Sequence, residues 1–308
     1  MIDADETFGG TWPFTANFFD GQGFKHHYID EGPQDTGETF VLLHGEPTWG
    51  YIYRKFVSRL TALGRVVVPD HMGFGKSETP QDREYSSQDH CENLAALLLD
   101  LDLDGVTLIM QDWGGPIGTH FAFNHPDRIK RAFYIDSLPC LGIPAGIDLA
   151  VLAEQGNTPW AQFFTSESFE PVMSHLSQTI LSVLKTVGFQ NNDIITPDWI
   201  RAYASPFPTI ESTKGAKAFP LANLSPDTFA YFAAAMKADG AVDALRAKPA
   251  MSVLGGEDKT LPEIMAKGMF REIWSDAQFL TLPGVGHYAQ EDAPDRLLAM
   301  IEQFVSTH

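Results

Sequence analysis

Short runs of apolar residues alternate with longer amphipathic stretches along the first half of the chain. The runs at 26–29, 40–43, 65–68, 106–110 and 131–135 have the length of strands, and residues 87–101 have the apolar spacing of an amphipathic helix. This alternation predicts a mostly parallel sheet flanked by helices. The three valines at 66–68 fit a strand that is buried on both faces, as parallel sheets require. The sequence therefore predicts an α/β fold.

The pattern changes in the middle of the chain. From about residue 140 to residue 225 the sequence is helical and irregular in character and rich in Pro, Phe and polar residues, and strand-like runs return at 251–254 and 279–282. We therefore expect a core domain made of residues 1–139 and 226–308, with residues 140–225 inserted as a helical cap.

Composition narrows the class of partner. A formal net charge of −19 argues against nucleic acid and anionic membranes, which need concentrated Lys and Arg, and favours a small neutral substrate. The N-terminus lacks the basic and apolar regions of a signal peptide, and no apolar run is long enough to span a bilayer, so we expect a cytoplasmic monomer. Cys91 and Cys140 are too few for a disulfide framework and lack metal-site spacing; we interpret them as small buried hydrophobes.

A candidate nucleophile follows the apolar run 106–110. The sequence Gln-Asp-Trp-Gly-Gly at 111–115 places Asp112 where a strand turns sharply into a helix, which resembles the nucleophile elbow of α/β-hydrolases. A carboxylate at that point suits attack on a saturated carbon that carries a leaving group, because the resulting alkyl ester can later be cleaved by water. The same Asp also fits a simple helix cap, so its role depends on the other motifs.

A candidate base and acid follow later strands. His287 lies in a glycine-containing loop after the last strand, and Asp258 follows the strand at 251–254, so the order nucleophile, acid, histidine matches that of α/β-hydrolases. Asp136, at the end of the strand at 131–135, is a rival acid because active-site groups gather at the carboxyl edge of such sheets. The order of the motifs favours Asp258.

The sequence His-Gly-Glu-Pro-Thr-Trp at 44–49 follows the strand at 40–43, where a second oxyanion-binding N–H is expected. Glu46 would supply that N–H from its backbone. A glutamate side chain facing Asp112 in a closed pocket is costly unless it is solvated or protonated, so we expect it to contact water rather than substrate. The glycine-rich turn at 73–77 lacks the spacing of a phosphate-binding loop and is interpreted as structural.

Together these motifs resemble the haloalkane dehalogenases of the α/β-hydrolase superfamily over nearly the whole chain. The resemblance rests on the sequences at 44–49, 73–77 and 111–115, on Tyr-Arg at 53–54, and on Tyr-Ala-Ser-Pro-Phe-Pro at 203–208. It implies that Asp112 is the nucleophile, His287 the base and Asp258 the acid. Glu46 and the cap sequence are similar to the subgroup that holds halide between two tryptophans.

In that subgroup Trp113 would be one halide ligand and a cap tryptophan the other. We expect the second ligand to be Trp160 rather than Trp199, because Trp199 begins a helix well after the expected place. Indole N–H groups suit a departing halide, since they are hydrogen-bond donors only.

The resemblance implies hydrolysis of a haloalkane to a primary alcohol, halide and a proton through an alkyl-aspartate ester, without cofactor or metal. The alternative is an epoxide hydrolase of the same fold, which needs phenol donors from the cap; Tyr203 and Tyr231 are its candidates.

Overall fold

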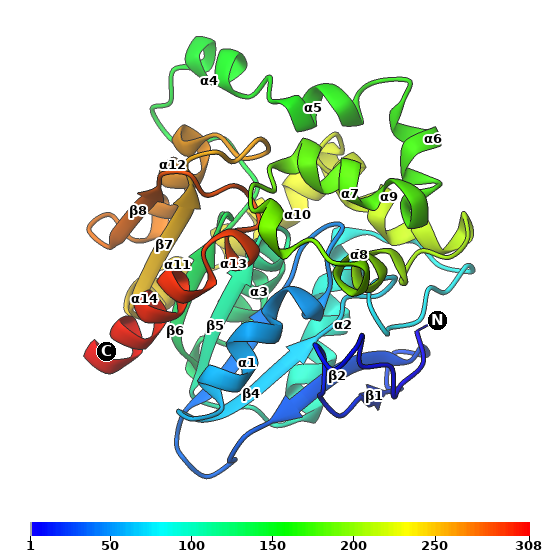
Figure 1. The fold of residues 1–308 in the computed structure, drawn as a ribbon. Helices are drawn as coiled ribbons and strands as arrows, with labels where there is room; N and C mark the ends of the chain where they lie inside the picture. Colours follow the sequence, from blue (N-terminus) through cyan, green and yellow to red (C-terminus); the bar gives the residue numbers. More distant parts are fainter. Residues whose placement is uncertain (1) are drawn as a thin grey trace.

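A computed structural model describes residues 2–308 as an eight-stranded sheet covered by helices on both faces (Figure 1). The strand order is β1-β2-β4-β3-β5-β6-β7-β8, and the pairings are parallel from β4 to β8 and antiparallel on both sides of β2. The predicted α/β fold with a mostly parallel sheet is confirmed. The strands are β1 (Asn17–Phe19), β2 (His26–Glu31), β3 (Thr39–Leu43), β4 (Arg65–Pro69), β5 (Val106–Gln111), β6 (Ile129–Ile135), β7 (Ala250–Gly255) and β8 (Gln278–Leu282).

The central strands are buried on both faces, as their continuous apolar sequences predict. Every residue of β5 and β7 is buried, whereas the edge strand β8 is largely exposed. The sequence did not indicate β1, which has three half-buried residues paired only with β2.

Helices from distant parts of the chain cover the two faces of the sheet. On one face α1 packs against α14; on the other α2, α10 and α11 pack against α3 (Figure 1). The helices are α1 (Arg54–Leu60), α2 (Ser87–Asp100), α3 (Gly114–Asn124), α4 (Leu149–Gln155), α5 (Pro159–Phe164), α6 (Phe169–Met173), α7 (Leu176–Val187), α8 (Pro197–Ala204), α9 (Lys214–Ala222), α10 (Pro226–Lys237), α11 (Ala241–Arg246), α12 (Glu263–Ile273), α13 (Ala289–Asp292) and α14 (Pro294–Thr307).

Helices α4 to α9 lie across the end of the sheet at which β5, β6 and β7 finish (Figure 1). One direct link between these helices and the rest of the molecule is the indole N–H of Trp49, which donates to Ala202 O at 2.8 Å. No helix within residues 2–308 is long and apolar enough to cross a membrane. In the same residues no group of three or more His, Cys, Asp or Glu side chains is arranged to hold a metal ion.

Several histidines are buried in the core near this end of the sheet. His44 Nδ1 contacts Gly45 O at 2.8 Å, and His44 Nε2 accepts the backbone N–H of His71 at 2.9 Å. Within residues 2–308 neither ring nitrogen of His26 or His90 has a hydrogen-bond partner. Burial lowers the pKa of His26 to about 4 and that of His90 to about 3. Both rings are therefore neutral at pH 7.

Candidate active site

Asp112 lies at the sharp turn between β5 and α3. Its φ of +48° falls in the left-handed region, which a non-glycine residue rarely adopts and which is typical of a nucleophile elbow. The backbone N–H of Glu46, in the loop after β3, donates to Asp112 Oδ1 at 2.8 Å. A Cβ atom at residue 45 would overlap Asp112 Oδ1, so this close approach requires Gly45. One carboxylate oxygen is therefore held by backbone, which leaves Oδ2 available for chemistry.

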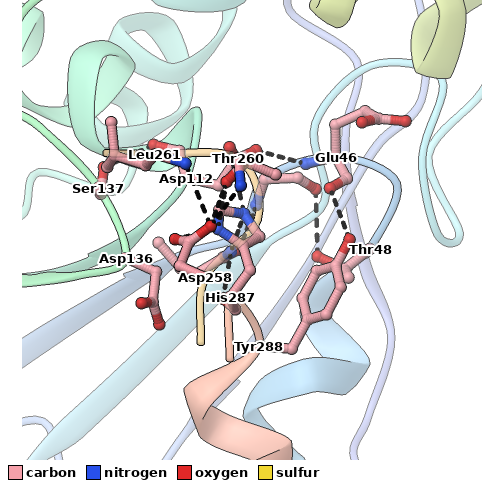
Figure 2. Close-up of polar contacts among 12 residues, drawn as sticks. Glu46, Thr48, Asp112, Asp136, Ser137, Asp258, Thr260, Leu261, His287 and Tyr288 are labelled. Carbon is pink, nitrogen blue, oxygen red and sulfur yellow. Dashed lines mark hydrogen bonds and ion pairs between the residues drawn. The ribbon is translucent and has the colours of Figure 1, made fainter. Parts of the chain in front are cut away.

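His287 lies between Asp112 and Asp258, the arrangement needed for a base and its orienting acid (Figure 2). Its Nδ1 is 2.8 Å from Asp258 Oδ2, and its Nε2 is 3.4 Å from Asp112 Oδ2. The ring and the Asp258 carboxylate are both buried, with 1% and 2% of their side chains exposed. The three residues come from the loops after β5, β7 and β8, so the parallel sheet brings them together at its carboxyl edge.

The neighbours of His287 set its protonation. Burial alone would lower the pKa of the imidazole, but Asp258 and Asp112 on its two sides raise it well above its ordinary value. The side chain of Gln111 lies against the same ring: its amide nitrogen is 3.1 Å from His287 Nε2 and donates to His287 O at 3.3 Å. Gln111 Oε1 accepts the N–H of Gly45, which fixes the orientation of the amide. The Gln111 amide can donate to Nε2 only when that nitrogen carries no proton, so it favours the unprotonated Nε2. The Asp112 carboxylate can only accept, so it favours a protonated Nε2.

The rival acid, Asp136, makes no contact with His287. Its φ is +45°, its Oδ1 accepts the N–H of Gly255 at 2.5 Å, and its Oδ2 is buried without a partner among residues 2–308. Burial and the nearby Asp258 raise the pKa of Asp136 well above its ordinary value. The neutral form of Asp136 is therefore favoured, while Asp258 is the carboxyl group in contact with His287.

The side chain of Glu46 is buried rather than open to bulk water, contrary to the sequence-based expectation. Only 4% of Glu46 is exposed, and its Oε1 has no partner in the described part of the chain. Burial and the Asp112 carboxylate raise the pKa of Glu46 well above its ordinary value. The protonated form of Glu46 is therefore favoured beside the Asp112 carboxylate, and solvation by bulk water is not what accommodates this side chain.

Asp112 opens into a cavity of about 220 Å³ between the sheet and the helices above it. Two tryptophans line this cavity: Trp113, from the elbow, and Trp160, from α5. Neither indole N–H has a protein acceptor within residues 2–308, although three other tryptophans donate theirs: Trp49, Trp199 and Trp274. The cavity walls also include Phe164, Leu138, Leu141, Val187 and Leu261. The cavity therefore combines the Asp112 carboxylate with two tryptophans that have no protein acceptor for their N–H groups within residues 2–308, and its lining is part apolar and part polar.

Trp199, the other tryptophan considered as a halide ligand, is not among the residues that line this cavity. Its indole N–H donates to Glu291 Oε1 at 3.2 Å, and the hydroxyl of Tyr203 donates to the same oxygen at 2.5 Å. Glu291 also forms a buried, bidentate ion pair with Arg54. This network joins α8 to α13, directly after the loop that carries His287.

The loop at 258–261 connects the acid to the helices over the cavity. The backbone N–H of Lys259 donates to Val187 O at 3.2 Å, and Lys259 O accepts the backbone N–H of Trp160 at 3.3 Å. The hydroxyl of Thr260 lies 2.8 Å from His287 Nδ1. The sequence analysis gave no role to Thr260 or Gln111. An aspartate is, however, a known signal for a turn in which its side chain accepts the backbone N–H two residues on, as Asp258 Oδ1 does from Thr260 N at 2.7 Å.

Comparisons with known proteins agree with this geometry. Residues 38–294 match the family described as alpha/beta hydrolase fold. A haloalkane dehalogenase of Psychrobacter cryohalolentis is 34% identical over 292 residues, 91% of this chain and 86% of the relative. One from Mycobacterium marinum is 35% identical over 266 residues, 81% of this chain and 80% of the relative.

Among solved structures, the tetrameric haloalkane dehalogenase DpaA from Paraglaciecola agarilytica NO2 superposes with a TM-score of 0.73 at 25% identity. That superposition covers 97% of this chain and 94% of the other. The fold and the elbow define a hydrolase of the α/β-hydrolase superfamily. Within that superfamily, the chain belongs to the haloalkane dehalogenase family.

Proposed function

We propose that this protein hydrolyses the carbon–halogen bond of small haloalkanes, giving a primary alcohol, a halide ion and a proton. The observation that carries the proposal is the pairing of a carboxylate at the elbow with two tryptophans that line the same cavity and whose indole N–H groups have no protein acceptor within residues 2–308. A cavity of about 220 Å³ suits a small substrate, since pockets for drug-sized ligands are roughly 300–1,000 Å³.

In the first step Asp112 Oδ2 attacks the carbon that bears the halogen. A carbon–oxygen bond forms as the carbon–halogen bond breaks, and the bonding electron pair leaves with the halide. Trp113 and Trp160 stabilise the developing charge with their N–H groups, which form the proposed two-tryptophan halide site.

In the second step water attacks the carbonyl carbon of the Asp112 ester. His287 Nε2 takes the proton of that water, Asp258 stabilises the resulting imidazolium, and the N–H groups of Glu46 and Trp113 hold the oxyanion at Oδ1. Collapse of this intermediate breaks the bond to the alkyl oxygen, which leaves as the alcohol with the proton held by His287. Loss of the remaining carboxyl proton to water restores the Asp112 carboxylate and gives the released proton. Esterification also removes the Asp112 charge, one of the causes of the raised pKa of His287 after Asp258, and this favours the neutral ring that a base requires.

The proposal includes the division of the chain. Residues 140–225 form the cap over the cavity, and residues 1–139 and 226–308 form the hydrolase core. It also includes two properties expected from the sequence, a monomeric state and a cytoplasmic location. Light scattering on the purified protein and fractionation of the producing cells test these two expectations.

The epoxide hydrolase alternative lacks free phenol donors. Tyr203 donates its hydroxyl to Glu291, and Tyr231 stacks on His120 with ring centroids 4.8 Å apart, away from the residues that line the cavity. A phenol that already donates to a carboxylate is poorly placed to protonate an epoxide oxygen.

The proposal is tested by measuring halide release from a panel of chloro- and bromoalkanes beside diol release from styrene oxide. We expect halide release only. A single turnover in heavy-oxygen water should give unlabelled alcohol and labelled Asp112, and Asp112→Ala should release no halide while remaining folded. Diol without halide would establish the alternative, and label in the first alcohol would exclude the ester intermediate.

A further inference from the structure

The hydroxyl of Thr260 lies between the acid and the base of the site (Figure 2). It is 2.6 Å from Asp258 Oδ1 and 2.8 Å from His287 Nδ1, while Asp258 Oδ2 is also 2.8 Å from His287 Nδ1. The three side chains therefore form a closed ring of short polar contacts. In the ordinary arrangement of acid and base only two of these groups are needed.

Proton accounting fixes the direction of each contact. The Asp258 carboxylate can only accept, so the single hydroxyl hydrogen of Thr260 points at Asp258 Oδ1. The Thr260 oxygen then faces His287 Nδ1 with its lone pairs and accepts from it. His287 Nδ1–H is consequently shared between two acceptors, Asp258 Oδ2 and Thr260 Oγ1.

Thr260 also donates two of the hydrogen bonds that the buried Asp258 carboxylate accepts. Asp258 Oδ1 accepts three hydrogen bonds, from Thr260 Oγ1 at 2.6 Å, from Thr260 N at 2.7 Å and from Leu261 N at 3.1 Å. With Oδ1 occupied, Oδ2 is the oxygen left to receive the imidazole. The positive end of the hydroxyl dipole thus faces the carboxylate, and its negative end faces the ring.

We propose that Thr260 is a positioning residue for ester hydrolysis, whose hydroxyl bridges Asp258 and His287 and stabilises the ion pair that forms when His287 takes a proton from water. This inference rests on the proposed function. The hydroxyl keeps its own hydrogen throughout: the proton moves from water to His287 Nε2, and Thr260 strengthens the charges on both sides of Nδ1. The displacement of halide by Asp112 needs no base, so it does not use Thr260.

The test compares Thr260→Val with Thr260→Ser. Valine keeps the branched shape and removes the hydroxyl, whereas serine keeps the hydroxyl. In rapid-mixing experiments with a bromoalkane we expect Thr260→Val to keep the wild-type rate of halide displacement and to release about one halide per active site in the burst. Its steady-state turnover should fall by about 10- to 100-fold, the factor that corresponds to a hydrogen bond to a charged group. Thr260→Ser should restore most of that turnover. Thr281→Val is the matched control, since it removes an exposed threonine–carboxylate contact on β8 with Glu263, and should behave as wild type.

The outcomes separate the inference from the proposed function. No halide release by wild-type protein would refute the proposed function itself. If the wild type is active, any of three results would overturn the role of the hydroxyl. Thr260→Val could turn over as fast as the wild type, it could lose halide burst and turnover to the same extent, or Thr260→Ser could be as slow as Thr260→Val. If Thr260→Val does not fold, Thr260→Ala against Thr260→Ser makes the same comparison with a smaller side chain.

Discussion

Trp199 and Glu291 are joined by an indole hydrogen bond of 3.2 Å, while the indole N–H of Trp160 has no acceptor in the described part of the chain. A donor already used by a buried carboxylate cannot also hold a halide ion. This difference separates the two cap tryptophans that the sequence offers as halide ligands.

The first prediction is therefore that Trp160→Phe weakens halide binding and slows halide displacement by about ten- to a thousandfold, the range for the loss of one transition-state donor. Bromide titration followed by tryptophan fluorescence measures the binding, and the burst rate measures the displacement. Thermal stability should change little, because phenylalanine keeps the aromatic bulk beside Phe163. Trp199→Phe is the comparison variant, and loss of halide affinity there but not in Trp160→Phe would show that the wrong tryptophan was assigned.

The second prediction concerns His287. Replacing it with Gln removes the base but leaves Asp112 and its contact with Glu46 N–H intact. His287→Gln should release about one halide per active site and then stop, because displacement needs no base whereas ester hydrolysis does. Mass spectrometry should find the alkyl group on Asp112. A variant that loses burst and turnover together would give His287 a structural role instead.

The third prediction distinguishes the two acidic residues at the sheet edge. Asp258→Asn should slow ester hydrolysis strongly, because it removes the negative charge 2.8 Å from His287 Nδ1. Asp136→Asn should have a small effect, since burial and Asp258 raise the pKa of Asp136 and favour its neutral form, and no ion pair joins it to His287 in the described part of the chain. Steady-state halide release measures both variants. The reverse ranking would move the acid to the end of β6.

The fold was predictable because its signals are local. Apolar runs marked the central strands, whereas β1 has only three half-buried residues and carries no such signal. The candidate nucleophile, base and acid were recognisable because each follows a strand or lies in a characteristic turn. The side-chain state of Glu46 was not predictable, because it depends on how completely distant segments bury it. Thr260 and Gln111 escaped notice for a similar reason: their contacts with His287 arise only when loops from different strands meet.

The fourth prediction is that His26 and His90 each contribute a loss of stability in mild acid, which Glu46, Asp136 and His287 oppose because their pKa values are raised. Burial lowers the pKa of His26 to about 4 and that of His90 to about 3, below the ordinary value of 6.5, so the unfolded chain binds protons at these residues first. The stability that these two neutral histidines contribute is fully present above pH 6.5 and is lost as the pH decreases towards 4. At pH 5 each histidine should cost about 2 kcal/mol of unfolding free energy relative to neutral pH.

Urea unfolding at pH 7.5 and at pH 5 measures this loss. From pH 7.5 to pH 5 the change in unfolding free energy should be about 2 kcal/mol more favourable in His90→Phe, which keeps an aromatic ring beside Phe219, than in the wild type. His308→Gln at the C-terminal end should show the wild-type change. An unchanged pH dependence in His90→Phe would show that His90 does not contribute.

The backbone of Lys259 joins two segments over the cavity, accepting from Trp160 and donating to Val187, and neither bond uses its side chain. Position 259 therefore constrains the chain only through its peptide groups. Substitution there is free to alter surface charge beside the site, provided that the residue keeps its N–H, and proline is the one amino acid that this requirement rules out. A cysteine placed at position 259 could carry a spectroscopic label. The label would report on the junction between the loop at 258–261 and helix α5 without replacing Asp112, Asp258 or His287.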